Sequence, residues 1–222
     1  MELREYLSIR KAYNLVRQEM DAERRLTFVE FAILCRLNVL DRPMNTSEIA
    51  EYQGALRPTM THRTKHLSRL GLLRRSKGSS DRRNVVCEIT ESGLEFTVVV
   101  CRSVCDVLHS GSILSRTTPQ RIYRYVDAMG GVSCMSGDLV LLGIAESGNA
   151  PCTISDLVSV LGLLQPTVSM SVASLEKDGM VYRERQGRAG RRSTDIRLTD
   201  QGERRARELT ESIRALVVKR KP

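Results

Sequence analysis

The strongest constraint on the fold is an internal repeat, because the second half of the sequence resembles the first at a spacing of about 108 residues. The segment LRPTM at residues 56–60 returns as LQPTV at residues 164–168, and the GL pair at residues 71–72 returns as GM at residues 179–180. Matches that keep one order over this length indicate duplication of a structural unit. We therefore expect two modules, residues 1–110 and residues 111–222, each long enough to bury a core.

The most informative part of the repeat is the stretch from residue 56 to residue 90. Pro58 suits the first turn of a helix, where its missing N–H costs nothing, and Gly71 suits the left-handed position after a helix. The apolar underside of this helix consists of Met60, Thr64 and Leu67. Its opposite face carries cations and hydrogen-bonding groups without an acid, which suits the groove of a polyanion, and the basic strands that follow predict a β wing. The alternative is a basic face that is only solvated.

Hydrophobic periodicity predicts a mainly α fold with small β wings, an α+β class. In the first module we expect helices at residues 5–20, 28–40, 48–52, 58–69 and 91–109, with wing strands at 72–76 and 84–89. In the second module we expect helices at residues 121–129, 138–146, 153–160, 166–178 and 200–218, with a wing between 181 and 198. Thr46 or Ser47 is the expected cap of the short helix at 48–52, and Thr90 that of the long helix.

The charge of the chain limits its partners. The net charge is +9 at pH 7, and both halves are basic, which favours an acidic partner such as nucleic acid or an anionic membrane surface. No apolar run approaches the roughly 18 residues of a membrane-spanning helix, and the N-terminus lacks a signal-peptide core. We therefore expect a cytoplasmic protein that does not enter the membrane. We do not expect an enzyme, because the sequence has no Gly-rich phosphate loop, nucleophile elbow or paired-carboxylate motif.

The six cysteines follow no metal-ligand pattern, and no CxxC occurs. The expected apolar stripe of the helix at 91–109 consists of Leu94, Val98, Cys101, Cys105 and Leu108. Cysteines at stripe positions are expected to act as small buried hydrophobes. The alternative is a redox-sensing thiol, which would need exposure and a depressed pKa.

Several features now stand in a fixed order: a buried helix, a short capped helix, a Thr-containing helix, Leu-x3-Gly-Leu at residues 67–72, a basic wing and Ile-Thr-x2-Gly at residues 89–93. In combination this pattern resembles the MarR-type winged-helix transcription regulators. The resemblance is closest over residues 28–94 and recurs more loosely over residues 136–203. It implies that each module is a winged helix-turn-helix whose Thr-containing helix reads DNA.

Regulators of this family typically form two-fold dimers through their N- and C-terminal helices. The resemblance therefore implies that the two modules form a pseudo-dimer within one chain, related by pseudo-two-fold symmetry and joined by a helical pairing layer. That layer would consist of the helices at residues 5–20, 91–109, 119–129 and 203–218. Whether two chains pair further, as a homodimer, stays open.

The resemblance also implies a repressor that a small, often aromatic, effector releases from DNA. The effector-binding residues are unknown. Aromatic side chains that could line such a site are Tyr6, Tyr13, Phe28, Phe31, Tyr123 and Tyr125. The alternative for each of them is an ordinary place in the core.

The candidate DNA-binding residues lie on the two reading helices and the two wings. On the first helix and wing they are Arg57, Thr59, Thr61, His62, Lys65, His66, Arg69, Arg82 and Arg83. On the second helix and wing they are Gln165, Thr167, Ser169, Met170, Ser174, Arg188, Arg191 and Arg192. The family's wing carries Asp-x-Arg, which Asp81 and Arg83 match, whereas Gly190 stands where the second wing would have the Asp.

The expected function is sequence-specific binding of double-stranded DNA by a transcription regulator. Because the two reading helices differ, we expect one chain to bind an asymmetric operator with unlike half-sites. His62 and His66 have the spacing of zinc ligands, but no acid or cysteine of the reading helix joins them, so we expect neither a metal nor a cofactor. An alternative is a plasmid-type replication initiator, since such proteins also use tandem winged helices.

Overall fold

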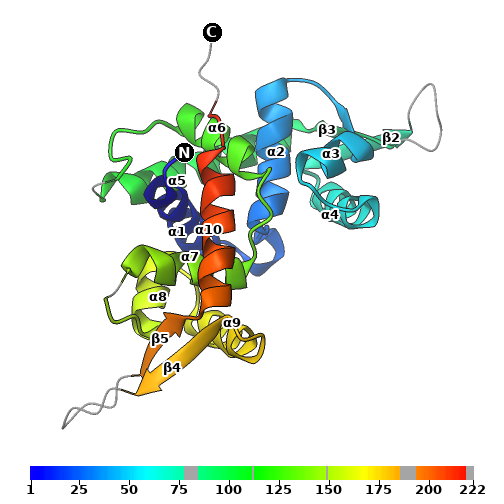
Figure 1. Ribbon diagram of the computed structural model, residues 1–222. Helices are drawn as coiled ribbons and strands as arrows, with labels where there is room; N and C mark the ends of the chain where they lie inside the picture. Colours follow the sequence, from blue (N-terminus) through cyan, green and yellow to red (C-terminus); the bar gives the residue numbers. More distant parts are fainter. Residues whose placement is uncertain (78–84, 112, 149, 186–193, 219–222) are drawn as a thin grey trace. The chain divides into compact units, whose positions relative to one another are not determined.

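The computed structural model describes residues 1–77, 85–111, 113–148, 150–185 and 194–218. It is mostly helical, with two small antiparallel sheets (Figure 1). The chain divides into two compact units. One comprises residues 16–133 and 217–222 and is here named the first-repeat unit; the other comprises residues 1–15 and 134–216 and is named the second-repeat unit.

The first-repeat unit contains a complete winged helix. Its elements in chain order are η1 (Ala22–Arg24), α2 (Phe28–Leu40), β1 (Met44–Asn45), α3 (Thr46–Tyr52), α4 (Arg57–Arg69), β2 (Leu73–Lys77), β3 (Val85–Ile89), α5 (Glu91–His109) and α6 (Pro119–Met129). The strand order is β1-β3-β2, and β2 pairs with β3 in the register Leu73 to Ile89 and Lys77 to Val85. The bounds of α2 and α5 are those predicted, and the expected wing strands are confirmed within one residue.

Local sequence signals explain where these helices begin and end. The Thr27 side chain accepts from the Glu30 amide while the Glu30 carboxylate accepts from the Thr27 amide, which forms a reciprocal cap for α2. Thr90 caps α5 as predicted. The predicted cap of α3 was wrong: Asn45, one residue earlier, accepts from the Ser47 and Glu48 amides. After α4, Gly71 adopts φ +73°, the left-handed conformation that glycine reaches without strain.

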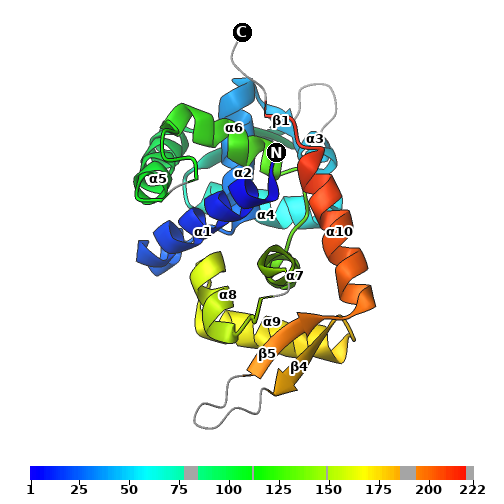
Figure 2. The ribbon, with the colours of Figure 1, turned by 60° about the vertical axis from the view of Figure 1, so that its left-hand side comes forward.

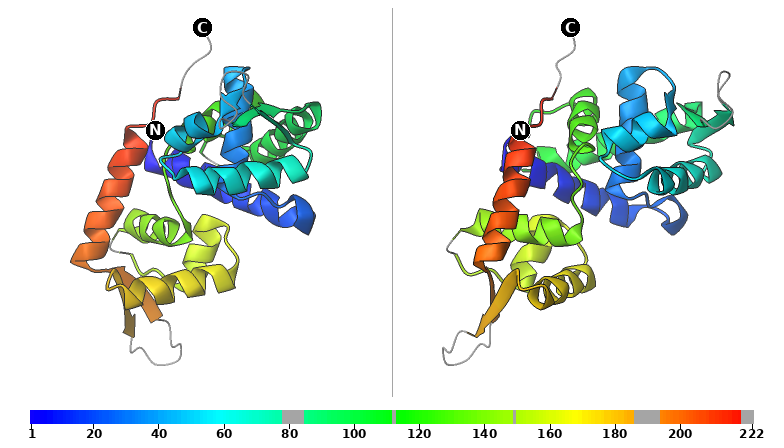
Figure 3. Two further views of the ribbon diagram at one scale, coloured as in Figure 1. Left: turned by 90° about the vertical axis from the view of Figure 1, so that its right-hand side faces the viewer. Right: turned by 45° about the vertical axis from the view of Figure 1, so that its right-hand side comes forward.

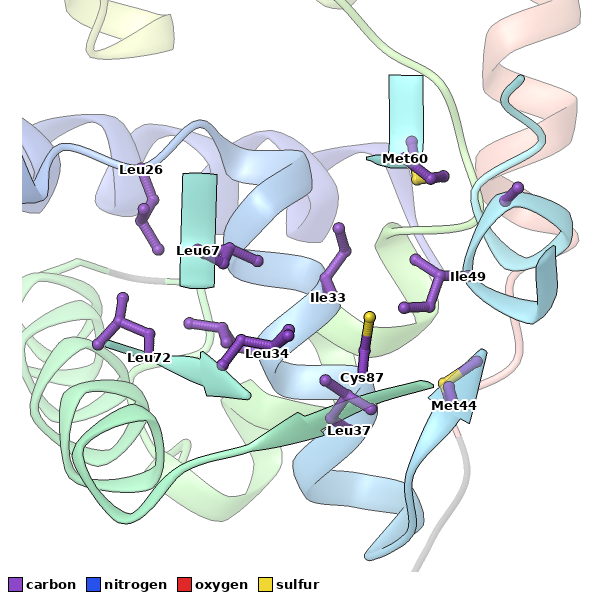
Figure 4. Packing of buried hydrophobic residues seen from close by; sticks show 12 residues of the cluster. Leu26, Ile33, Leu34, Leu37, Met44, Ile49, Met60, Leu67, Leu72 and Cys87 are labelled. Carbon is purple, nitrogen blue, oxygen red and sulfur yellow. The ribbon is translucent and has the colours of Figure 1, made fainter. Parts of the chain in front are cut away.

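The core of the first-repeat unit lies between α2, α4 and the sheet (Figure 4). Ile33 and Leu37 of α2 are buried together with Met60 and Leu67 of α4 and with Cys87 of β3. A substitution such as Leu67→Ala in such a core typically costs about 2–5 kcal/mol of folding free energy. Burial of this underside orients the opposite face of α4 toward solvent.

In its described residues, the second-repeat unit repeats the plan with a two-stranded sheet. It contains most of α1 (Leu3–Glu19), then α7 (Ser136–Ser147), α8 (Ile154–Leu161), α9 (Gln165–Lys177), β4 (Val181–Arg185), β5 (Thr194–Leu198) and α10 (Asp200–Arg214). β4 and β5 form an antiparallel pair that lies beside α9 (Figure 2). α10 begins just after β5 and packs against α7, which it crosses at a steep angle (Figure 3).

Each repeat begins with a helix, α1 in the first and α6 in the second, and this leading helix belongs to the compact unit of the other repeat. Most of α1 lies in the second-repeat unit, and α6 lies in the first-repeat unit. In the second-repeat unit, the Asn14 side chain of α1 donates to the Leu161 carbonyl over 2.9 Å. In the first-repeat unit, Asp127 of α6 accepts from Arg36 of α2 over 3.3 Å. The predicted modules, residues 1–110 and 111–222, are defined by the repeat in the sequence and differ from these compact units. Their boundary stays a prediction.

The buried face of α5 differs from the predicted stripe. Leu94 and Val98 are each 38% exposed, so these two assignments were wrong, whereas Cys101, Cys105 and Leu108 are buried as predicted. Val100 and Val104 complete the buried face instead. Val98, Val99 and Val100 point to different sides of the helix, so hydrophobicity alone did not fix which side faces the core. The short strand β1 was not predicted either.

No single helix among the described residues is long and apolar enough to cross a membrane, although α8 and α9 pass that test together as a pair bent by 118°.

Candidate nucleic-acid interface

The first reading helix, α4, presents a polar and cationic face to solvent. Its underside of Met60, Thr64 and Leu67 is buried as predicted. The exposed side chains among the predicted contacts are Arg57, Thr59, His62, Lys65 and Arg69. Cations, hydroxyls and an imidazole on one exposed face can reach phosphates and base edges.

Two predicted contacts of α4 are turned partly inward. Thr61 is half-buried. The His66 side chain is 31% exposed, and its Nδ1 lies 2.6 Å from Oε1 of Glu30 on α2. The structure therefore places His66 at the edge of the exposed face, with one ring nitrogen engaged by a buried acid.

Sequence reasoning missed the side chains that fix α4 on the rest of the unit. Besides the contact of His66 with Glu30, Arg63 donates to the Gln53 side chain over 2.7 Å, and Gln53 donates to the Val29 carbonyl over 2.7 Å. The Thr-x2-Glu sequence at residues 27–30 could have identified the helix cap. The contact between residues 30 and 66 is long-range, so no periodic pattern signals it.

The Glu30 carboxylate lies at the junction between α2 and α4. Burial alone would raise its pKa, but hydrogen bonds from the Thr27 side chain and backbone and from His66 outweigh burial and lower the pKa below its usual value. The carboxylate is therefore ionised throughout the neutral range. A buried anion under a basic helix orients that helix while leaving its outer face positive.

The end of α3 links α4 to α6 within the same unit. Tyr52 donates its hydroxyl to the Asp127 carbonyl over 2.6 Å, and the Arg36 guanidinium lies 4.8 Å from the centre of the Tyr52 ring. Burial, followed by the nearby Asp127 carboxylate, raises the pKa of Tyr52 well above its usual value. The next residue, Gln53, holds Arg63 of α4. Two adjacent residues at the end of α3 thus contact different helices: Tyr52 contacts α6, and Gln53 contacts the reading helix α4.

The second reading helix, α9, has a different exposed face. Val168, Val172 and Leu175 form its buried underside. Among the predicted contacts, Gln165, Met170 and Ser174 are exposed and Thr167 and Ser169 are half-buried. Met170 is 74% exposed. This face offers an amide, hydroxyls and a thioether in place of the histidines and lysine of α4.

Ion pairs connect the two strands of each wing. Arg74 of β2 pairs with Glu88 of β3 at 2.5 Å, and Arg197 of β5 pairs with Glu184 of β4 at 2.6 Å. Arg183 pairs with Glu176 of α9 at 3.3 Å. The predicted wing contacts lie outside the described residues: Arg82, Arg83, Arg188, Arg191 and Arg192, together with Asp81 and Gly190.

The six cysteines are buried free thiols. Burial, followed by contact with the Cys35 thiol, raises the pKa of Cys101 well above its usual value. Burial, followed by the Asp106 carboxylate, raises the pKa of Cys105 to about 11. A redox-sensing thiol needs the opposite shift, so the geometry favours a packing role for both.

The aromatic residues predicted as effector contacts lie mostly in the core. Tyr6, Tyr13, Phe28, Phe31 and Tyr125 are buried, and Tyr123 is half-buried. A cavity of about 550 Å³ lies in the second-repeat unit, and residues of α7, β4, β5 and α10 line it. None of these six aromatic residues is among its lining residues.

Two matches to the MarR family cover separate parts of the chain, residues 26–85 and residues 139–192. Together they span just over half of its length, and each contains one of the two reading helices. Among curated proteins, none matches the sequence.

Similar solved structures include the transcriptional regulator BldR from Sulfolobus solfataricus, which is 24% identical with a TM-score of 0.40; the match covers 50% of this chain and 73% of BldR. Another is the disulfide-formed AbfR, which is 25% identical with a TM-score of 0.32, over 58% of this chain and 82% of AbfR.

Proposed function

Because the chain belongs to the MarR family, as a tandem of two of its winged-helix modules, we propose that this transcriptional regulator is a repressor that binds an asymmetric operator as a pseudo-dimer within one chain. Family membership makes it a non-enzymatic regulator with operator DNA as its partner. It also favours promoter binding over the role of a replication initiator.

The observation that carries the proposal is the difference between the two exposed reading faces. Lys65 and Arg69 of α4 are exposed cations that suit phosphate or guanine, and His62 lies on the same exposed face. Gln165 of α9 has the bidentate amide that suits adenine, and Met170 can meet a thymine methyl group. Unlike faces specify unlike half-sites, so one chain would not need a palindrome.

The pseudo-dimer follows from the duplication. Two reading helices on neighbouring major-groove faces of a duplex are separated by about 34 Å, one turn of B-DNA. We propose that the two units bind half-sites at this spacing and that one chain therefore replaces a family dimer. The net charge of +9 supplies the attraction to phosphate that such binding requires.

A small-molecule effector is a further part of the proposal. A cavity of about 550 Å³ in the second-repeat unit lies against α10 and the wing strands. Its floor includes Ile144, Ile196 and Ala206, and its rim includes Arg207 and Glu211. A ligand there would contact both the wing and the helix that follows it, which supports release of DNA through a shift of the wing.

An electrophoretic mobility shift with the chain's own upstream DNA tests the proposal, with unrelated duplex as competitor. We expect retention of the upstream duplex at competitor concentrations that displace non-specific binding. Lys65→Ala should weaken binding and reduce the slope of log K against log salt by about 1. Arg102→Ala removes the same charge from the exposed face of α5 and should change affinity less than twofold. Equal effects of the two substitutions, or binding of all duplexes alike, would contradict the proposal.

A further inference from the structure

A groove lies between the start of α7 and the second reading helix, α9, within the second-repeat unit. Its volume is about 490 Å³. Met135 and Met170 line it and are 64% and 74% exposed, and Leu141 is a further apolar wall. Asp138 and Asp178 are among the polar residues that line it. Exposed methionines are adaptable contacts for apolar ligands.

At the equivalent place in the first-repeat unit, two side chains are in direct contact. Asp138 lies about 108 residues after Glu30, and Ser174 lies the same distance after His66. In the first repeat the His66 imidazole contacts the Glu30 carboxylate at 2.6 Å. In the second repeat Ser174 is too short to cross the groove. The first repeat therefore places its own imidazole against this acid, and the second repeat leaves that space open.

Ser171 also lies in the groove, where Arg63 stands in the first repeat. Arg63 extends to Gln53, whereas the Ser171 hydroxyl donates to the Ser136 hydroxyl over 3.2 Å. An arginine and a histidine of the first repeat thus correspond to two serines in the second, and these shorter side chains leave the groove open.

The charges that line the groove favour a cation. Asp138 accepts from Arg205 over 3.1 Å and from the Met135 amide over 3.0 Å, so its charge is partly offset. Asp178 is exposed at the end of α9, where the helix dipole is also negative. Two carboxylates against one guanidinium leave a local negative charge on a chain whose net charge is +9.

We propose that this groove binds a small organic cation, an amine with an apolar tail. The ammonium group lies against Asp138 and Asp178, as His66 lies against Glu30, and the tail packs on Met135, Met170 and Leu141. Bound there, the ligand covers Met170 and Ser174 on the reading face. Its effect on DNA rests on the proposed function: the amine competes with DNA at the second half-site. Binding of the amine itself does not depend on that function.

The first experiment measures binding to the full chain without DNA. The probes are 4-phenylbutylamine and 4-phenylbutyrate, which share an apolar tail and differ in the sign of their charge. Titration is followed by calorimetry and by the methyl NMR signals of Met135 and Met170, assigned with Met→Leu variants. We expect saturable binding of the amine with shifts at both methionines, and at least tenfold weaker binding of the carboxylate. Equal binding of the two probes, stronger binding of the carboxylate, or no binding of the amine at millimolar concentration overturns the proposal.

Two variants locate the site. Ser174→His places in the groove the side chain that fills it in the first repeat, and it should weaken amine binding at least tenfold. Asp178→Asn changes only an exposed charge, so it tests the proposal even if the first variant fails to fold, and it should weaken binding about three- to fivefold. Asp106→Asn removes an exposed charge from α5 and should leave binding unchanged. Unchanged binding in the Asp178→Asn variant, or an equal loss in the Asp106→Asn variant, overturns the proposal.

Competition with DNA is measured separately, with duplexes that carry either half-site alone. The amine should reduce affinity for the second half-site and leave the first unaffected. If the chain binds no duplex while the amine still binds the groove, the proposed function fails and the site stands. If the chain binds DNA and the amine does not bind, the site fails and the function stands.

Discussion

Glu30→Gln tests how the first reading helix is held. The carboxylate accepts from the Thr27 amide at 2.9 Å, from the Thr27 hydroxyl at 2.7 Å and contacts His66 at 2.6 Å. A glutamine can keep both Thr27 contacts, because these share one oxygen, but it has no charge and its amide nitrogen cannot accept a hydrogen bond from His66. Loss of one hydrogen bond to a charged group costs about 1.5–3 kcal/mol. Because the His66 side chain is only partly buried, we expect about 2 kcal/mol of destabilisation in the first-repeat unit.

The pH dependence of that destabilisation follows from the lowered pKa of Glu30. In the unfolded chain a glutamate has a pKa of about 4.3. The group contributes stability above that pH and loses it as the pH falls through its lower folded pKa. The free energy of unfolding of the parent chain should therefore fall more steeply in acid than that of Glu30→Gln, and the two should converge below about pH 4.

Hydrogen exchange followed by mass spectrometry separates the two units in one experiment. At pH 7, Glu30→Gln should raise exchange in α4 and at the start of α2. The matched control is Asp138→Asn, at the equivalent position of the second repeat, where the carboxylate contacts Arg205 and the Met135 amide. That variant should raise exchange in α7 and α10 and leave α9 unchanged. Unchanged exchange of α4 in Glu30→Gln would refute the reasoning.

Three further predictions concern packing, recognition and the cysteines. Gly130→Ala would place a Cβ 2.0 Å from the Tyr52 hydroxyl, so it should lower the free energy of unfolding by about 1–3 kcal/mol, measured by thermal unfolding with circular dichroism. Gly131→Ala is the control, because its Cβ would meet atoms at ordinary distances of 3.5 and 3.6 Å. Equal losses of stability in the two variants would count against the Tyr52 contact. His62→Ala should cost about 1–3 kcal/mol of the free energy of DNA binding and relax base preference at one half-site only; unchanged preference at both half-sites would contradict a base contact of His62. Because burial raises the pKa of Cys105 to about 11, native thiols should react with a disulfide reagent at pH 8 about 100-fold more slowly than free cysteine, and rapid modification without unfolding would favour a redox role.

Most elements of the fold could be predicted because their signals are local. Pro58 and Gly71 delimit the first reading helix, and the buried Met60 and Leu67 follow helical periodicity. The duplication then transferred the same plan to residues 154–198, where the sequence pattern is weaker. The exposed face of α4 followed from the position of its buried stripe, since residues on the opposite side of the helix must face solvent.

The rest depended on contacts between residues far apart in the chain. The pairing of His66 with Glu30 joins residues 36 positions apart, so His66 could not be separated from the exposed His62 by helical phase alone. Strand β1 has only two residues and forms because Met44 and Asn45 pair with β3. The face of α5 was ambiguous because valines occur on several sides of the helix, and packing against α2 and α6 selects the buried one. The assignment of the leading helices to the opposite units likewise has no local signal.

The central claim is that one chain binds two unlike half-sites. The most direct measurement is selection of bound genomic DNA, followed by footprinting of the best site and by native mass spectrometry of the complex. The account predicts one chain per operator and a footprint over two different half-sites about one helical turn apart. A palindromic site bound best by two chains would contradict it.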